Sequence, residues 1–285
     1  MRVLREVAVR GSFSAAAEAL SFTQSAISQQ IAALERETGT TLVQRNARGI
    51  RLTEAGEALV RHTDAILARL NEAEAELEAI AGLRGGRLRL GAFESAAATL
   101  MPLAIAAFRA QHPAVELSMI MGEPDDTQPL LKAGELDLIL GFDSRVRDEV
   151  DGVTRQHMIS DPMFLVMATD HPLARKRHVK LADFADDTWI AGVTDCECNR
   201  LINRACAVAG FEPRIAFQTD DYTAIQGFVA AGVGVSLIAE LGLTSIRDDI
   251  VVRQLGREAP VRQIYAATCV GAQWNQAARQ PSSDR

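Results

Sequence analysis

The chain has 285 residues, of which 48% are hydrophobic, and a formal net charge of −7 at pH 7. This length accommodates two or three domains, and the apolar content can build a core, which excludes a disordered or fibrous protein. The sequence shows no signal-peptide pattern of charged residues followed by apolar ones, and no apolar run long enough to span a membrane. We therefore expect a soluble, cytoplasmic protein that does not bind membranes. Four cysteines in a cytosolic chain of this size do not predict a disulfide framework.

Residues 11–53 predict two short helices around a tight turn, followed by a small wing. Thr23 is a favourable N-cap for the second helix, which runs from Gln24 to about Thr38 and ends at Gly39. Apolar side chains at spacings of four and three give this helix an inward face, made by Ile27, Ile31 and Leu34. The pattern therefore predicts a helix-turn-helix module.

The outward face of the second helix carries short neutral side chains with amide and hydroxyl groups. A glutamine can hydrogen-bond an adenine edge, a serine can serve either base, and an alanine can contact a thymine methyl group. We therefore expect this face to read DNA, with the candidate residues Thr23, Gln24, Ser25, Ala26, Ser28 and Gln29. The alternative is a small helical bundle with a solvated polar face.

Residues 41–52 predict two short strands around a turn at 46–49. The arginines of this wing suit contacts to phosphates or to a narrow minor groove, and they are Arg45, Arg48 and Arg51. Residues 1–53 hold seven arginines and four glutamates, a charge of +3, which leaves −10 for the rest of the chain. A basic head on an acidic body fits a protein that binds double-stranded DNA at one end.

Residues 54–84 predict one long helix, because they lack proline and contain glycine only at positions 56 and 82. Two heptad positions form a seam, which consists of Leu59, Ile66, Ala73 and Ile80 with Thr63, Leu70 and Leu77. The seam predicts pairing with a second copy of the chain, because two heads can read two half-sites. The alternative is a helix that packs on its own domain.

From residue 87 onward the pattern alternates strands and helices, which predicts an α/β body of two lobes. The expected strands are 87–93, 115–121, 137–142, 162–170, 188–193, 214–219, 234–239 and 261–269. The expected helices are 95–111, interrupted early by Pro102, and 127–133, 197–210 and 221–231. Residues 137–142 form a nearly unbroken apolar run, as in a parallel strand buried on both faces.

The order of these parts resembles the LysR-type transcriptional regulators of bacteria. The resemblance rests on the alanine-rich helix, the segment TQSAISQQI, the arginine wing closed by LTEAG, and AAGVGVSLIA at 230–239. It implies a winged helix-turn-helix DNA-binding domain at 1–53, a dimerisation linker helix at 54–86, and a periplasmic-binding-protein-like effector domain at 87–285. Lobe I would span about 87–161 and 265–285, and lobe II about 162–264. In the family, the residues matching Gln24, Ser25, Ala26, Ser28 and Gln29 face the bases, and the residue matching Arg45 meets the DNA backbone.

The resemblance also implies a small-molecule effector in the cleft between the lobes, against helix N-termini. The matching positions are Glu94, Ser95, Ala96, Glu123, Phe142, Asp143, Asp195, Cys196, Cys198, Asp220, Asp221 and Tyr222. Helix N-termini favour anions, yet Glu94, Glu123 and Asp195 would surround the cleft with negative charge. Our hypothesis is that the effector is cationic, hydroxylated or of mixed charge rather than a simple carboxylate.

The pair Cys196 and Cys198 stands at a helix start, where the helix dipole can lower the pKa of a thiol. This spacing leaves thiol-redox sensing or soft-metal sensing open as alternatives to cysteines that merely line an effector loop. Cys206 and Cys269 are expected to be buried apolar residues. A four-ligand zinc site is not supported, so neither a metal nor a cofactor is expected.

The motifs of common enzymes are missing, including Gly-x-Ser-x-Gly, the phosphate loop and Gly-x-Gly-x-x-Gly, so we do not expect an enzyme. A solute-binding protein is disfavoured, because it would need a signal peptide and would lack residues 1–84. The sequence predicts a ligand-responsive transcription factor that forms a homodimer and assembles to a tetramer, with RNA polymerase as a further possible partner.

Overall fold

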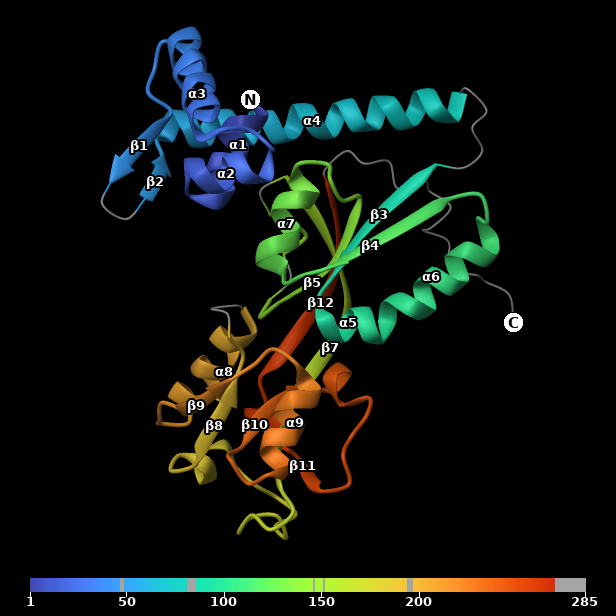
Figure 1. Ribbon diagram of the computed structural model, residues 1–285. Helices are drawn as coiled ribbons and strands as arrows, with labels where there is room; N and C mark the ends of the chain where they lie inside the picture. The colour runs from blue at the N-terminus through green and yellow to red at the C-terminus, as the bar shows by residue number, and fades with distance from the viewer. Residues whose placement is uncertain (47–48, 81–85, 146, 151, 194–196, 270–285) are drawn as a thin grey trace.

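The computed structural model describes the chain apart from residues 47–48, 81–85, 146, 151, 194–196 and 270–285. Figure 1 shows a small helical head with a wing at one end of a long helix. Lobe I of the body lies beneath this helix, and lobe II lies at the far end of the molecule. In the part of the chain that the model covers, no helix is both long and apolar enough to cross a membrane.

The head consists of the helices α1 (Arg2–Arg10), α2 (Phe13–Ala19) and α3 (Gln24–Thr38). The hydroxyl of Thr23 caps α3 by accepting a hydrogen bond from Ala26 N at 3.2 Å, and Gly39 ends α3 with a φ of 69°. The predicted bounds of the second helix are thereby confirmed. The three helices share a core whose largest buried members are Leu4, Val7, Phe13, Ile27, Ile31 and Leu42.

The wing pairs β1 (Val43–Asn46) with β2 (Gly49–Leu52) in antiparallel register, Val43 opposite Leu52. This confirms the two strands predicted there. Thr53 then caps the long helix α4 (Glu54–Ile80), because its hydroxyl accepts a hydrogen bond from Gly56 N at 3.1 Å.

The predicted seam of α4 divides into two parts. Leu59 packs against the core of the head, and Thr63 is buried and donates a hydrogen bond to Leu59 O at 2.7 Å. Ile66 and Leu70 are instead 48% and 54% exposed. The first part of the seam therefore serves the protomer's own head, and the apolar surface left open begins at Ile66.

The sheet of lobe I has the strand order β4-β3-β5-β12-β7. Its strands β3 (Arg87–Ala92), β4 (Glu116–Met121) and β5 (Leu138–Asp143) run parallel, and the short β6 (Glu149–Val150) pairs with β7. The helices of this lobe are α5 (Glu94–Ala98), α6 (Leu100–Gln111) and α7 (Pro124–Lys132). The parallel strands of the sheet bring their carboxyl ends to the edge that faces lobe II, where ligands bind in open α/β sheets.

Two long antiparallel strands, β7 (Val153–Ala168) and β12 (Val261–Cys269), run from lobe I into lobe II (Figure 1). In lobe II, β10 (Ser236–Ala239) and β11 (Ile250–Gln254) pair with β7, and β8 (Thr188–Ala191) pairs in parallel with β9 (Arg214–Gln218). The lobe is completed by α8 (Glu197–Val208), α9 (Tyr222–Ala230) and the 3-10 turns Leu181–Phe184, Glu240–Leu243 and Gly256–Glu258.

Two predictions about these elements were wrong. The strand expected at 162–170 begins at Val153, because its first half pairs with β12 although that half is polar and largely exposed. The interruption expected at Pro102 lies at Thr99, between α5 and α6. Pro102 sits in the first turn of α6, where a proline has no hydrogen bond to lose.

Candidate functional site

The head presents one polar helix face to solvent. Gln24, Ser25 and Gln29 are exposed, Ala26 and Ser28 are half-buried, and the hydroxyls of Thr23 and Ser25 lie 3.0 Å apart. The apolar residues of α3 point the other way, into the core of the head. The residues predicted to read bases therefore lie at the start of α3 or on its solvent-facing side. The helix has a diameter that the major groove of DNA admits.

The wing places Arg51 of β2 on the surface next to this head. Arg48 and the side chain of Arg45 lie outside the described residues, so their predicted contacts to the DNA backbone stay predictions. Among the three wing arginines, Arg51 is the one with a described side chain, and it is a cation of the kind that contacts phosphates.

A second candidate site is a hollow between the two lobes. Lobe I contributes residues after β3, after β4 and at the end of β5, while lobe II contributes residues of β8, α8, α9 and β10. Apolar and polar groups converge there, as expected of a small-molecule site. Its walls are formed by Phe93, Glu94, Ser95, Glu123, Phe142, Ala191, Gly192, Cys198, Asn199, Ile202, Thr219, Asp220, Tyr222, Ile225, Ser236, Leu237 and Arg262.

Arg262 of β12 lies buried at the base of the hollow. Its Nε donates to Asp161 Oδ2 at 3.0 Å and its Nη2 to Ser95 Oγ at 2.9 Å. The guanidinium also lies 5.0 Å from the ring centre of Phe93 and 4.8 Å from that of Phe142. Arg262 thereby connects both crossing strands to the start of α5.

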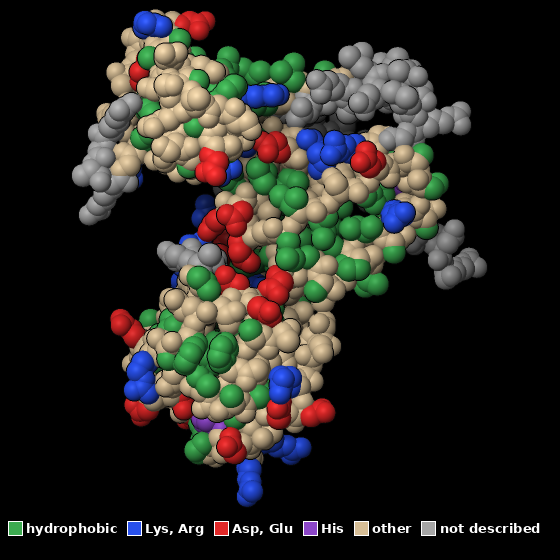
Figure 2. Space-filling model, in the orientation of Figure 1, with side chains coloured by type: hydrophobic (Ala, Val, Ile, Leu, Met, Phe, Trp, Pro, Cys, Tyr) green, Lys and Arg blue, Asp and Glu red, His purple; other side chains and the backbone are tan. Residues whose placement is uncertain are grey.

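The remaining charged groups of the hollow are acids. Burial raises the pKa of Glu123 to about 7, and the carboxylates of Asp220, Asp126 and Asp125 raise it while Arg262 opposes them. Burial also raises the pKa of Glu94, with further contributions from Asp221 and Asp220. On the face shown in Figure 2, acidic side chains gather at the waist between the lobes.

Asp220 reaches the hollow because Gly192 leaves room for it. Val193 N donates a hydrogen bond to Asp220 Oδ1 at 2.9 Å, and Asn199 Nδ2 donates to Gly192 O at 3.1 Å. A Cβ at Gly192 would lie 2.7 Å from Asp220 Oδ1 and 3.1 Å from Asn199 Nδ2. Glycine is therefore required here for two polar side chains to approach the backbone.

The other side of the waist carries an ion pair between the lobes. Arg200 Nη2 of α8 lies 3.2 Å from Asp125 Oδ2 of α7, and Arg200 Nε lies 3.0 Å from Glu197 Oε2. This pair joins α8 of lobe II to α7 of lobe I, two residues along the chain from Glu123.

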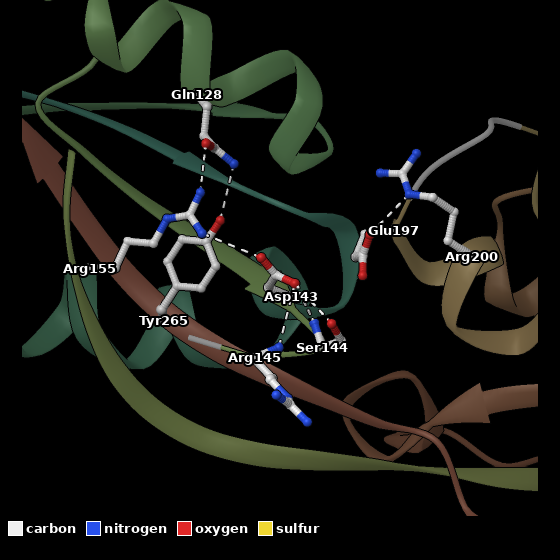
Figure 3. Close-up of polar contacts among 8 residues, drawn as sticks. All are labelled: Gln128, Asp143, Ser144, Arg145, Arg155, Glu197, Arg200 and Tyr265. Carbon is white, nitrogen blue, oxygen red and sulfur yellow. Dashed lines mark hydrogen bonds and ion pairs between the residues drawn. The ribbon is translucent and has the colours of Figure 1, made fainter. Parts of the chain in front are cut away.

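Lobe I supports the hollow with a buried polar cluster around Arg155 of β7 (Figure 3). Arg155 Nη2 donates to Gln128 Oε1 at 2.9 Å, and Gln128 Nε2 donates to the Tyr265 hydroxyl at 3.1 Å. Arg155 Nη1 lies 3.4 Å from Asp143 Oδ2, and the guanidinium lies 4.5 Å from the ring centre of Tyr265. Asp143 follows Phe142 on β5, so the cluster fixes the end of the strand that lines the hollow.

The structure brings together Glu94, Ser95, Glu123, Phe142, Cys198 and Tyr222 of the predicted effector residues. Ala96 is instead buried in the core of lobe I, and it is not a wall of the hollow. Asp221 caps α9, because its Oδ1 accepts hydrogen bonds from Thr223 N at 2.7 Å and Ala224 N at 3.1 Å. Asp195 and Cys196 lie outside the described residues.

The most important wall residue that the sequence analysis missed is Arg262. A charged residue inside a largely apolar strand signalled it, since a buried arginine needs a partner. Asp220 and Asp221 were both matched to the cleft, and Asp220 lines the hollow while the side chain of Asp221 caps α9.

The cysteines of lobe II differ in their surroundings. Cys198 is half-buried and lines the hollow, whereas Cys206 is buried in the lobe II core. Burial raises the pKa of the Cys206 thiol to about 11, the opposite of the activation that redox sensing needs. Within the described residues, no group of three or more His, Cys, Asp or Glu side chains is placed to hold a metal ion.

A polar helix face on a winged head and a hollow between the lobes of a two-lobed body together define a DNA-binding regulator with an effector domain. Residues 1–57 match the family model for the bacterial regulatory helix-turn-helix protein of the LysR family, and residues 81–280 match the LysR substrate binding domain. The chain therefore belongs to the LysR-type transcriptional regulators, and its head and body are the DNA-binding and effector-binding domains of that family.

Curated relatives agree with this assignment. The chain is 30% identical over 241 residues to the transcriptional dual regulator GltC of Bacillus subtilis, which covers 84% of this chain and 79% of GltC. It is also 30% identical over 240 residues to the transcriptional regulator CbbR of Rhodospirillum rubrum, covering 84% of this chain and 78% of CbbR. Both relatives are named as transcriptional regulators.

Among solved structures, a mutant of OxyR from Corynebacterium glutamicum has a TM-score of 0.62 at 21% identity, over 98% of this chain and 87% of that one. The regulator CbnR in complex with its target DNA has a TM-score of 0.57 at 24% identity, over 98% of this chain and 96% of CbnR. These likenesses show that the complete arrangement of head, linker helix and two-lobed body is a known fold.

Proposed function

We propose that α3 reads the operator through Gln24, Ser25, Ala26, Ser28 and Gln29, and that Arg51, with Arg45 and Arg48, holds the wing to the DNA backbone. The observation that carries this proposal is the single exposed polar face of α3, opposite the buried Ile27 and Ile31. Glutamine and serine suit base edges in the major groove, whereas arginines suit phosphates.

The regulator acts as a homodimer in this proposal, and the dimer assembles to a tetramer. Ile66 and Leu70 leave an apolar strip open on α4, which fits pairing with the same helix of a second copy. Two heads then contact two half-sites, which multiplies affinity and specificity. In this proposal the protein acts in the bacterial cytoplasm, where operator DNA lies and where RNA polymerase is a further partner.

A small effector binds in the hollow between the lobes and stabilises one arrangement of the body over another. Because the lobes are joined by β7 and β12 and by the ion pair of Arg200 with Asp125, closure around a ligand changes contacts on both sides of the waist. A ligand with unequal affinity for the two arrangements shifts the equilibrium between them, and through it the binding of the operator.

The variant Gln24→Ala tests the reading helix. Loss of a good base contact should cost roughly 1–3 kcal/mol on the specific operator and much less on random DNA. Fluorescence anisotropy of the full-length protein on both DNAs, with the region upstream of its own gene as the source of the operator, measures the difference.

The matched control is Gln30→Ala, since Gln30 is exposed on the same helix but lies outside the proposed reading face. The Gln30→Ala variant should leave the difference in affinity between operator and random DNA unchanged. Arg51→Ala should weaken binding to all DNA sequences alike and lower the dependence of DNA affinity on salt concentration. Equal losses for Gln24→Ala on specific and random DNA would contradict the proposed role of Gln24.

A further inference from the structure

The single arginine among the described walls of the hollow is already compensated. Arg262 and Asp161 are each 1% exposed, and the carboxylate of Asp161 lies against the guanidinium in the base of the hollow. Ser95 and the hydroxyl of Tyr222 occupy two further donor positions, at 2.9 Å and 3.4 Å. An anionic ligand would therefore have to compete with Asp161 for the positive charge that the site offers.

The described contacts of Glu123 leave one of its carboxylate oxygens unmatched. It stands at the N-cap of α7, yet its side chain makes no capping hydrogen bond. Its Oε2 is shut off from solvent and has no hydrogen-bond partner among the described residues. A buried acceptor of this kind is costly to leave unmatched, so its presence on the wall of a hollow points to a donor supplied by a ligand.

The rest of the lining agrees with a ligand that has one charged end. Glu94 and Asp220 lie with Glu123 on the wall, so the described acids outnumber the arginine. Phe93, Phe142 and Ile202 give the hollow apolar surface as well. Carboxylates beside apolar side chains suit an organic cation with an apolar body, through charge pairing and apolar contact.

We infer that the effector is a small organic cation with an apolar body, and that Glu123 binds its ammonium or guanidinium group. This inference rests on the proposed function, since it names the chemistry of the ligand that the interlobe hollow takes. Glu94 and Asp220 hold the same positive end, and the aromatic walls hold the body.

A cation at Glu123 makes binding depend on pH in a defined direction. Glu123 faces Arg262 of β12, Asp125 and Asp126 of α7, and Asp220 before α9. Since burial raises the pKa of Glu123 to about 7, the carboxyl is largely neutral at about pH 6 and largely ionised at about pH 8. The cation should therefore bind more tightly as the pH rises through this range.

The experiment is calorimetry of the full-length protein with matched trios that differ only in the head group. One trio is phenethylamine, phenethyl alcohol and phenylacetate, and the other is isoamylamine, isoamyl alcohol and isovalerate. We expect at least one amine to bind roughly tenfold more tightly than its alcohol at about pH 8, a difference of about 1.4 kcal/mol. Its carboxylate should bind more weakly still.

Glu123→Gln should abolish the preference for that amine and its dependence on pH, and leave binding of the alcohol unchanged. This variant should fold at least as stably as the parent, because ionising a buried carboxyl without a partner opposes folding. Glu116→Gln is the matched control, since Glu116 is exposed at the opposite end of β4. Two amines that bind no better than their alcohols, or carboxylates that bind best, would overturn the inference.

Operator binding by the same preparations separates this inference from the proposed function. A protein that binds its operator but prefers carboxylates retains the proposed function and refutes the cationic effector. A protein that binds the amine through Glu123 but ignores DNA supports the inference and refutes the proposed reading helix.

Discussion

At the scale of single residues, Arg262 and Asp161 hold the two lobes together at the point where the crossing strands pass between them. They are cross-strand neighbours on β12 and β7, and Asp161 Oδ1 also accepts a hydrogen bond from Leu241 N of lobe II at 3.1 Å. A buried ion pair of this kind adds little over an apolar pair, but removing one partner leaves a buried charge without compensation.

Asp161→Asn should therefore lower the free energy of unfolding by about 3–5 kcal/mol, because the shape is kept while Arg262 loses its counter-charge. Urea unfolding of the full-length protein measures this loss. Asp249→Asn is the control, since Asp249 pairs with Arg247 on the surface and exposed pairs contribute little. Equal losses of unfolding free energy for Asp161→Asn and Asp249→Asn would contradict the prediction that Arg262 depends on Asp161 for its counter-charge.

Single residues were predictable where a local rule decides their role. Thr23 and Gly39 follow from the chemistry of helix ends, which acts within a few positions of the chain. Arg262 did not follow, because its partner Asp161 lies 101 positions away and only the pairing of β7 with β12 brings the two together. Asp220 and Asp221 were both matched to the cleft, because neighbouring residues with the same side chain cannot be told apart before the start of α9 is known; Asp221 caps that helix and Asp220 lines the hollow.

At the scale of elements, the hydrophobic periodicity of the sequence predicted strands with one buried face, but it did not predict strand segments that are largely exposed. Residues 153–161 of β7 are mostly polar and mostly exposed, so their pattern does not mark a strand. Their extended form is imposed by β12, which pairs with residues 153–162 of β7. β11 was also missed, and it becomes a strand by pairing with the second half of β7.

The junction of the wing with α4 depends on a close approach that only glycine permits. A Cβ at Gly56 would lie 2.1 Å from Leu42 O, a backbone atom that cannot move without displacing the wing. Gly56→Ala should therefore destabilise the head by roughly 1–3 kcal/mol or more, measured by thermal unfolding. Displacement of Leu42 by the added methyl group would also tilt the arginine-bearing wing away from its position beside α3.

Gly227→Ala is the matched control for this prediction. Gly227 lies within α9, and a Cβ there would meet no atom within 4 Å. Since alanine is the better helix former, this substitution should be neutral or stabilise the protein by up to about 1 kcal/mol. A Gly56→Ala protein as stable as Gly227→Ala would mean that the wing adjusts to α4 at no cost.

At the scale of the whole molecule, α7 connects the hollow to the DNA-binding head. Glu123, in the wall of the hollow, precedes the first residue of α7. In the C-terminal half of α7, Pro129 O accepts a hydrogen bond from Arg5 Nη2 of α1 at 3.2 Å. Arg5 is buried and also pairs with Asp64 of α4 at 3.1 Å and with Glu135 at 2.6 Å. One arginine of the head thus contacts α4 and lobe I together.

The two-lobed body was predictable through the resemblance to the LysR family, but this contact was not. Arg5 and Glu135 are 130 positions apart, and both belong to types that are usually solvated. Burial reveals the role of Arg5, since a buried arginine without its carboxylates would be costly. A shift of α7 on ligand binding can therefore reach the head through Arg5, because the hollow and Arg5 contact the same short helix.

Arg5→Met should loosen the head from lobe I without disturbing the reading face of α3. The methionine keeps apolar volume in the head core, whereas Asp64 loses the cation that opposes the effect of burial on its pKa. We expect the free energy of unfolding to fall by roughly 1–3 kcal/mol, and hydrogen exchange to rise in residues 129–136 of lobe I. Arg10→Met is the control on the same helix, because Arg10 pairs only with Glu6 on the surface among the described contacts. Unchanged exchange in residues 129–136 would mean that the head is held by α4 alone, and that α7 transmits nothing to it through Arg5.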